Sequence, residues 1–333
     1  MQTKSLLIMN EKIIITGANG FLGDALCSSL YRQNNAFLAV VRKNTGKVNW
    51  PLRAIGDINK STDWSPVLSE ASCVIHTAAR VHVMNGDVTN PFDKFREVNT
   101  CGTLNLAQQA ADAGVKRFIF ISSIKVNGEF TDLDLPFRPD THYIPTDPYG
   151  LSKYEAEVGL REIAEKTGME VVIIRPPLVY GPGVKANFAS MMKWMNKGLP
   201  LPLGGINKNK RSLVSVDNLV DLILTCIEHP KAANQTFFIS DDDDVSTSQL
   251  LTNMATALDA PNRLLPIPSS WFILAAKLIG KPAISQRLCA SLQVDISKTK
   301  DLLDWTPPYS SAECMKKTAD AFREKLNVEK NTK

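Results

Sequence analysis

Short apolar runs alternate with longer amphipathic segments through the first two thirds of the chain. We expect buried strands at residues 12–17, 37–42, 73–79, 117–123, 170–177 and 235–240. Helices are expected at residues 21–33, 92–113, 149–167 and 216–228, two of them ending near Gly114 and Gly168. Strands that are apolar throughout and separated by helices are typical of parallel sheets covered on both faces, so the pattern predicts a doubly wound α/β fold.

The pattern changes after Gly181. Residues 181–188 and 196–211 are rich in Gly, Pro and Asn, which favours loops over strands. The acid run Asp241–Asp244 favours a solvated turn before a helix that begins near Ser246. The last ninety residues look helical and irregular, which predicts a smaller lobe beside the sheet.

Residues 271–280 are the most apolar stretch of the later chain, but they are too short to span a bilayer and include Lys277. A packed helix is the favoured interpretation, and contact with a membrane surface is the weaker one. The N-terminal residues include no apolar run long enough for a signal segment, so none is expected, and Met9 is as good a start as Met1. These features predict a cytoplasmic protein without an integral membrane segment.

Composition narrows the possible functions. A chain of 333 residues with 44% hydrophobic content can bury a large core. The net charge of +4 is small and spread along the chain, so it gives no electrostatic case for nucleic acid. The six cysteines have no metal-type spacing, and several stand in apolar contexts, which indicates reduced core thiols and no metal site.

A glycine motif follows the first predicted strand. Gly17, Gly20 and Gly23 are spaced GxxGxxG, and Phe21 and Leu22 open the next helix. Glycine allows a tight turn and close backbone approach to a pyrophosphate, which the N–H groups of the helix N-terminus would bind. The motif predicts dinucleotide binding; the alternative is a turn with a structural role only.

Tyr149 and Lys153 stand one helical turn apart, and Ser123 ends a predicted strand. An ammonium group near a phenol favours the phenolate, so the lysine is expected to draw the tyrosine pKa toward neutrality. A serine hydroxyl at the carboxyl end of a strand can donate to a substrate oxygen. An ordinary helix surface is the competing interpretation of the Tyr–Lys pair.

Several motifs then occur in one order along the chain: TGANGFLG, GDI, HTAA, EVNTCGTLNL, FISS, YGLSK and RPPLVYGPG. The chain thereby resembles the extended short-chain dehydrogenases/reductases, and more narrowly their nucleotide-sugar epimerase/dehydratase branch. The resemblance implies a Rossmann domain at 1–177 plus about 212–240, and a mixed nucleotide-sugar lobe at about 178–211 and 241–333. It also implies a catalytic triad of Ser123, Tyr149 and Lys153.

The same resemblance implies further site residues. Asp57 and Ile58 would lie at the adenine, Ala78 and Ala79 would line the cofactor, and Asn99 would support the active site. Substrate phosphates would be bound by Asn187 and Arg211, a role that suits a guanidinium fork. A homodimer formed by the helices at 92–113 and 149–167 is also implied.

Departures from the family pattern limit the chemistry. Ile124 and Lys125 replace the acid and base of the sugar dehydratases, so dehydration is not expected. His82 and Lys125 are candidate substrate-pocket residues, with a surface or packing role as the equal alternative.

Arg42 decides between the remaining reactions. It stands about 20 residues past the glycine turn, where an NAD enzyme usually has a carboxylate and an NADP enzyme a cation for the 2′-phosphate. We therefore predict an NADPH-dependent reductase of a UDP-4-keto-6-deoxy-N-acetylhexosamine in surface-polysaccharide biosynthesis. The alternatives are an NAD-dependent UDP-glucose or UDP-N-acetylglucosamine 4-epimerase, with Arg42 a solvated turn residue, and a non-catalytic NADP(H) sensor.

Overall fold

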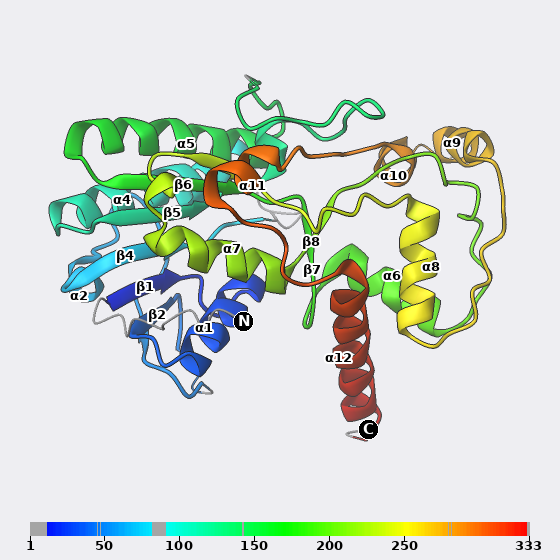
Figure 1. Cartoon of the computed structure of the whole chain (residues 1–333), viewed down its shortest axis with the longest axis horizontal. Helices are drawn as coiled ribbons and strands as arrows, with labels where there is room; N and C mark the ends of the chain where they lie inside the picture. The colour runs from blue at the N-terminus through cyan, green and yellow to red at the C-terminus, as the bar shows by residue number, and fades with distance from the viewer. Residues whose placement is uncertain are drawn as a thin grey trace. The chain divides into compact units, whose positions relative to one another are not determined.

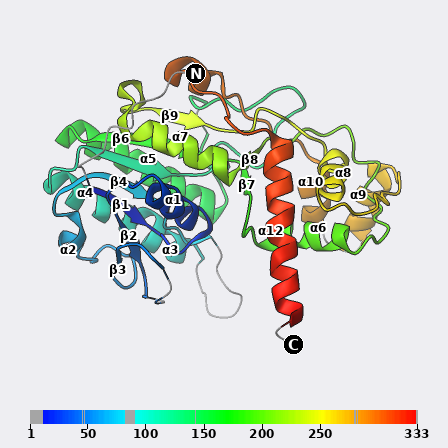
Figure 2. The same cartoon turned by 60° about the horizontal axis from the view of Figure 1, so that its bottom comes forward.

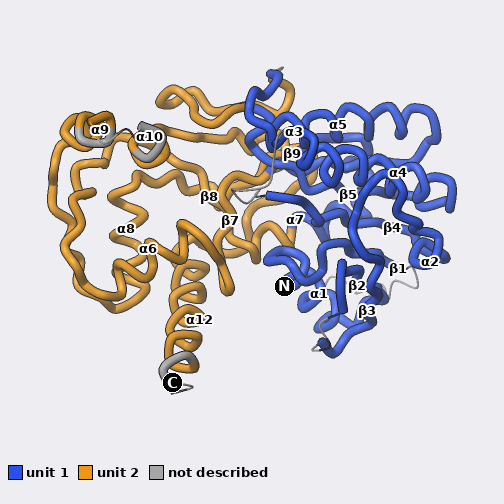
Figure 3. Tube along the Cα trace, turned by 180° about the vertical axis from the view of Figure 1, so that it is seen from behind, with its two compact units in different colours: residues 1–127, 142–175, 222–237 blue, residues 128–141, 176–221, 238–333 orange. Residues whose placement is uncertain are grey.

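The computed structural model describes residues 12–44, 46, 48–81, 91–141, 143–278, 280 and 282–331. The chain forms two compact units, which are coloured separately in Figure 3. Unit 1 comprises Met1–Asn127, His142–Arg175 and Leu222–Phe237, and unit 2 comprises Gly128–Thr141, Pro176–Asp221 and Phe238–Lys333. The division proposed from the sequence placed residues 128–141 and about 212–221 with the sheet, whereas both segments belong to unit 2; the other boundaries differ by two or three residues.

Unit 1 is built on a seven-stranded sheet of order β3-β2-β1-β4-β5-β6-β9. Its strands are β1 Lys12–Thr16, β2 Phe37–Val41, β3 Leu52–Ala54, β4 Ala71–His76, β5 Arg117–Ile121, β6 Glu170–Arg175 and β9 Thr236–Phe238. The pairs from β3 to β6 are all parallel, with Ile14 beside Leu38 on one side and Val74 on the other. The first six positions have the strand order of doubly wound dinucleotide-binding sheets, which confirms the predicted fold class.

The strands are apolar throughout because both faces of the sheet are covered. Ile13, Ile14 and Ile15 of β1 are all fully buried. Figures 1 and 2 show α4 and α5 on one face and α1 on the other. The unit 1 helices are α1 Phe21–Arg32, α2 Ser65–Leu68, α3 Pro91–Phe95, α4 Thr103–Asp112 and α5 Pro148–Thr167. Such a fold places the carboxyl ends of β1, β2 and β4 along one edge, where ligands bind.

The helix predicted at 92–113 runs without a break over residues 91–112, but it is not α-helical throughout. It consists of α3, a π-helical segment η1 at Arg96–Gly102, and α4. Within η1, the buried Asn99 accepts a hydrogen bond from the Arg80 backbone N–H at 2.8 Å and donates to the Ser152 hydroxyl at 3.0 Å. These partners are distant in sequence, so the widened turn could not be seen in the local periodicity.

Unit 2 contains a two-stranded parallel sheet, β7 Leu178–Tyr180 and β8 Leu213–Ser215. Its helices are α6 Ala186–Asn196, α8 Thr247–Ala257, α9 Ser269–Leu278, α10 Pro282–Cys289, α11 Ser297–Leu303 and α12 Ser311–Asn331, while α7 Val216–Glu228 continues into unit 1. Residues of α6, α8 and α12 share one apolar core, which includes Phe188, Leu251 and Met315. Ser246 caps α8 by accepting from the Gln249 N–H, as the sequence predicted.

The acid run is only partly a solvated turn, so that prediction is wrong for its first residue. Asp241 is buried and accepts hydrogen bonds from the Tyr180 hydroxyl at 2.7 Å and the Asn218 amide at 2.7 Å. Burial raises the pKa of its carboxyl. Asp241 therefore joins β7, α7 and the end of β9 within the second unit. No helix in the described part of the chain is long and apolar enough to cross a bilayer.

Candidate active site

The glycine turn after β1 needs glycine for steric reasons. Gly17 has a φ of +69°, and a Cβ there would lie 2.7 Å from the Ala78 backbone nitrogen. A Cβ on Gly23 would lie 2.2 Å from the Gly17 carbonyl oxygen. Phe21, Leu22 and Gly23 form the first turn of α1. No side chain among the described residues caps α1, so its first N–H groups are available to a pyrophosphate.

A cavity of about 1040 Å³ opens at the carboxyl ends of β1, β2 and β4. This volume is at the upper end of the range for cofactor sites. Seven of the residues predicted to bind the cofactor line it: Gly17, Gly20, Arg42, Asp57, Ile58, Ala78 and Ala79. The residues present therefore fit a dinucleotide, bound where the strand order reverses between β1 and β4.

Arg42 has a carboxylate partner at the rim of this cavity. Its guanidinium Nη1 lies 3.7 Å from Asp57 Oδ1, and both side chains are mostly exposed. Such a pair contributes little to stability in water. Its relevance is to ligand choice, because the Asp57 carboxylate lies beside the cation that the sequence assigned to a 2′-phosphate.

Ser123 and Tyr149 are hydrogen-bonded to each other within unit 1. Ser123 follows β5 and caps a short 3₁₀ helix, Ile124–Val126, whereas Tyr149 lies in the first turn of α5. Burial raises the pKa of Tyr149 to about 12, and Asp147 adds to the rise while Ser123 opposes it. The shift is opposite to the sequence expectation because desolvation of the phenolate outweighs the hydrogen bond.

Lys153 lies one turn further along α5 and is almost completely buried. Its Nζ donates to the Ile121 carbonyl at 2.9 Å and lies 4.4 Å from the centre of the Phe120 ring. Burial lowers the pKa of Lys153 to about 7, although Glu157 acts in the opposite direction. The ammonium group is thus held under the end of β5, on the same face of α5 as Tyr149.

Sequence reasoning missed a buried network around Glu157. This carboxylate accepts from the Ser122 hydroxyl at 2.6 Å and from the Arg175 Nε at 2.8 Å. Arg175 also donates to Asn127 at 2.9 Å. The network joins α5 to the ends of β5 and β6, next to Ser123. The available signal was spacing, because Tyr149, Lys153 and Glu157 follow one another at intervals of four residues.

Of the two predicted substrate-pocket residues, Lys125 lies within the described part of the chain. Lys125 forms an ion pair with Asp147 at 3.3 Å, and Asp147 also caps α5 by accepting from the Gly150 N–H. Lys125 thus contacts the segment that positions Tyr149. His82 lies outside the described residues, as does Met9.

The two predicted phosphate-binding residues lie in unit 2. Arg211 is mostly buried and donates to the carbonyls of Arg287 at 3.0 Å and Ala290 at 3.2 Å. Burial lowers the pKa of its guanidinium, and no carboxylate among the described residues pairs with it. Asn187 is exposed in the first turn of α6, which has no side-chain cap. Both features suit an anionic ligand.

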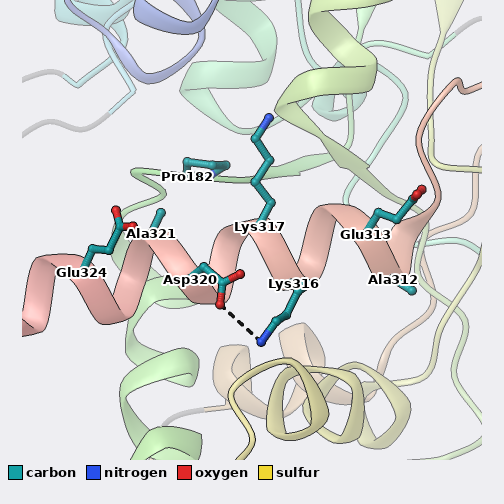
Figure 4. A pocket seen from close by; sticks show the side chains of 8 residues that line it. All are labelled: Pro182, Ala312, Glu313, Lys316, Lys317, Asp320, Ala321 and Glu324. Carbon is teal, nitrogen blue, oxygen red and sulfur yellow. Dashed lines mark ion pairs between the residues drawn. The ribbon is translucent and has the colours of Figure 1, made fainter.

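A shallow hollow of about 740 Å³ lies along α12 and contains none of the predicted residues. Figure 4 shows its side chains along this helix opposite Pro182, with Lys316 paired to Asp320 at 3.3 Å. Its walls are mainly charged side chains that stand in solvent. We assign no ligand to it. Within the described ranges, no group of three His, Cys, Asp or Glu residues could hold a metal ion.

The chain is similar to known proteins both in sequence and in fold. The chain is 52% identical over 320 residues to a UDP-glucose 4-epimerase from Vibrio cholerae, an alignment that covers 96% of this chain and 98% of the relative. Among solved structures, it is similar to the UDP-glucose 4-epimerase of Thermotoga maritima with UDP-glucose, with a TM-score of 0.74, 23% identity and coverage of 95% and 99%. A UDP-glucuronic acid 4-epimerase from Bacillus cereus in complex with NAD has a TM-score of 0.73, 22% identity and coverage of 94% and 99%.

These comparisons correct two predictions. The 52% identity to a 4-epimerase contradicts the predicted reduction of a 4-keto sugar and favours the alternative, an NAD-dependent epimerase. The predicted preference for NADP(H) finds no support in these comparisons; one solved structure of similar fold, the Bacillus cereus enzyme, contains NAD. The error came from Arg42, whose partner Asp57 could not be inferred from the sequence.

The family itself was identified correctly. A model described as the NAD dependent epimerase/dehydratase family matches residues 13–240, which include the glycine turn, the cavity and the triad. Its match agrees with the strand order and with the residues gathered at the carboxyl edge of the sheet. This chain belongs to the NAD dependent epimerase/dehydratase family.

Proposed function

We propose that this protein is an NAD-dependent 4-epimerase of UDP-sugars, with UDP-glucose as the first substrate to test. The 52% identity to the Vibrio cholerae UDP-glucose 4-epimerase, over nearly the whole of both chains, carries the proposal. The hydrogen bond between Ser123 and Tyr149, with Lys153 on the same helix face, supplies groups suited to the reaction.

Cofactor binding would use the unit 1 cavity. The turn at Gly17 and Gly20 and the open start of α1 suit a pyrophosphate. Asp57 and Ile58 would contact the adenine end. Asn99, through its hydrogen bonds to the Arg80 backbone, would keep the segment after β4 in place along the cofactor. NAD is preferred in this proposal because Arg42 already faces a carboxylate.

Tyr149 would act as the base and then the acid at the sugar 4-hydroxyl. Ser123 would hold the same oxygen by a hydrogen bond, and the Lys153 ammonium would stabilise the phenolate as it forms. When bound, NAD would accept the hydride from carbon 4 and return it to the opposite face of the sugar. Because Tyr149 is buried, its phenolate would depend on Ser123 and Lys153 for stabilisation.

Substrate binding would involve the unit 2 residues. Arg211 is a desolvated cation held by carbonyl oxygens, so an anionic ligand would compensate its charge. A nucleotide diphosphate meets that requirement, and Asn187 at the start of α6 could add a hydrogen bond. A homodimer and a cytoplasmic location, both expected from the sequence, remain part of the proposal.

The test is an interconversion assay. Purified protein supplied with NAD should convert UDP-glucose to UDP-galactose, followed by chromatography, without net accumulation of reduced cofactor. Tyr149→Phe should lower kcat about 10²–10⁴-fold while leaving the circular dichroism spectrum unchanged. Failure to interconvert any UDP-hexose or UDP-N-acetylhexosamine pair would overturn the proposal. Tyr154→Phe, on the same helix, is the matched control and should retain activity.

A further inference from the structure

Helix α9 exposes large apolar side chains that have no described cover. Trp271, Leu274 and Leu278 are 72%, 59% and 78% exposed, and their spacing places them on one stripe of the helix. Lys277 is also exposed, at the edge of that stripe. A ten-residue helix is only about 15 Å long, so α9 could not cross a bilayer of about 30 Å.

The apolar surface continues into the segment that precedes α9. Leu265 and Ile267 are 47% and 36% exposed. This segment is fixed to residues 201–204 by hydrogen bonds from the Leu265 N–H to the Leu201 carbonyl, 2.8 Å, and from the Gly204 N–H to the Leu265 carbonyl, 2.9 Å. Of the twenty large apolar side chains that are exposed in the described residues, six lie within residues 265–278. The concentration distinguishes this surface, which we call the α9 surface, from scattered exposed residues.

The charge of the surrounding sequence is one-sided. Residues 260–294 contain Arg263, Lys277, Lys281 and Arg287 but no Asp or Glu. This segment therefore carries a local excess of four positive charges without an opposing carboxylate.

We propose that the α9 surface binds an anionic lipid membrane, with α9 lying in the plane of the headgroups. Trp and Leu side chains on a short helix would enter the boundary between headgroups and acyl chains, and Lys277 would extend to the lipid phosphates. Each basic residue near an anionic surface adds attraction, and the absence of carboxylates over 35 residues removes the opposing repulsion. A protein partner would require no such uniform charge.

Vesicle flotation tests the proposal. The full-length protein should float with vesicles that contain phosphatidylglycerol, less with vesicles of phosphatidylcholine alone, and less as salt is raised. The triple variant W271S/L274S/L278S should lose at least about tenfold in partitioning, and Lys277→Gln about fivefold. The matched control L133S/L135S removes two exposed leucines between Asp132 and Asp134 and should bind as the wild type does.

A spectroscopic measurement locates the contact. Brominated lipids should quench tryptophan fluorescence in the wild type and in Trp194→Phe, and the quenching should be largely lost in Trp271→Phe, which still floats. All variants should retain the epimerase activity of the wild type in solution. Absence of flotation, equal binding to neutral vesicles, or full binding by the triple variant would each overturn the proposal. The proposal would also be overturned if the wild type bound no vesicles and the triple variant formed a smaller assembly than the wild type in gel filtration. A second copy of the chain would then cover the surface.

Discussion

Lys153 occupies a position where its own charge is unfavourable in the absence of ligands. It is 1% exposed, and its near neighbours are the Ile121 carbonyl and the Phe120 ring. Burial lowers its pKa from 10.5 to about 7. The unfolded chain therefore binds this proton more tightly than the folded chain does. The resulting loss of stability is complete below about pH 7 and disappears as the pH rises toward 10.5.

This argument predicts that Lys153→Met stabilises the protein without cofactor while abolishing catalysis. At about pH 7 the variant should have a higher Tm than the wild type, by a few degrees or more, because no buried charge remains. The difference should shrink by about pH 9, where the wild-type lysine is mostly neutral when folded. Thermal unfolding at the two pH values, with Lys166→Met on the exposed end of α5 as control, provides the measurement. A variant that is less stable at neutral pH would contradict the burial argument.

At the scale of elements, α5 connects the groups proposed for catalysis to the sheet. Tyr149 and Lys153 face the end of β5, and Glu157 holds Ser122 at that same end. Arg175 brings in the end of β6 through two hydrogen bonds to Glu157. Because Glu157 is fully buried, its charge is tolerated only with these partners in place.

We predict that Glu157→Gln destabilises the protein by about 3–5 kcal/mol, since Arg175 would be left as a buried cation without its carboxylate. The double variant E157L/R175M should recover a large part of that loss, because neither charge remains. The measurement is a double-mutant cycle of E157L, R175M and E157L/R175M, with E157Q measured beside it, from urea unfolding followed by fluorescence. Glu162→Gln is the control: this exposed partner of Lys166 should change stability by less than about 0.5 kcal/mol. Additive effects of the two single changes would show that the pair does not act as a unit.

The elements also show why some features could be predicted from the sequence. The strands from β1 to β6 that bury both faces are apolar throughout, and the Gly17 turn depends on local sterics, so both were recognisable. The short strands β3, β7 and β8 were not predicted, whereas β9, which is equally short, lies within the apolar run at 235–240 that was predicted as a strand. The π segment η1, the burial of Asp241 and the Glu157 network depend on partners distant in the chain. The pairing of Arg42 with Asp57 also joins residues that are distant in the chain. Without knowledge of this pairing, Arg42 was assigned to a 2′-phosphate.

For the whole molecule, the proposed function can be tested through the preference for NAD over NADP. A ligand that binds only the folded chain raises stability by about 2.7 kcal/mol at 100 times its Kd, so thermal shifts report relative affinity. NAD should raise the Tm more than NADP at equal concentration. Asp57 lies 3.7 Å from the Arg42 guanidinium. Its carboxylate would repel a 2′-phosphate and would also compete with that phosphate for the guanidinium.

Asp57→Ala should therefore increase the NADP shift relative to the NAD shift, because it frees Arg42 for the 2′-phosphate. In D57A/R42A that gain should disappear, which separates the effect of the guanidinium from the removal of negative charge. Asp112→Ala, an exposed carboxylate at the end of α4, is the matched control and should leave the ratio unchanged. A wild-type protein stabilised more by NADP than by NAD would contradict this account of Asp57.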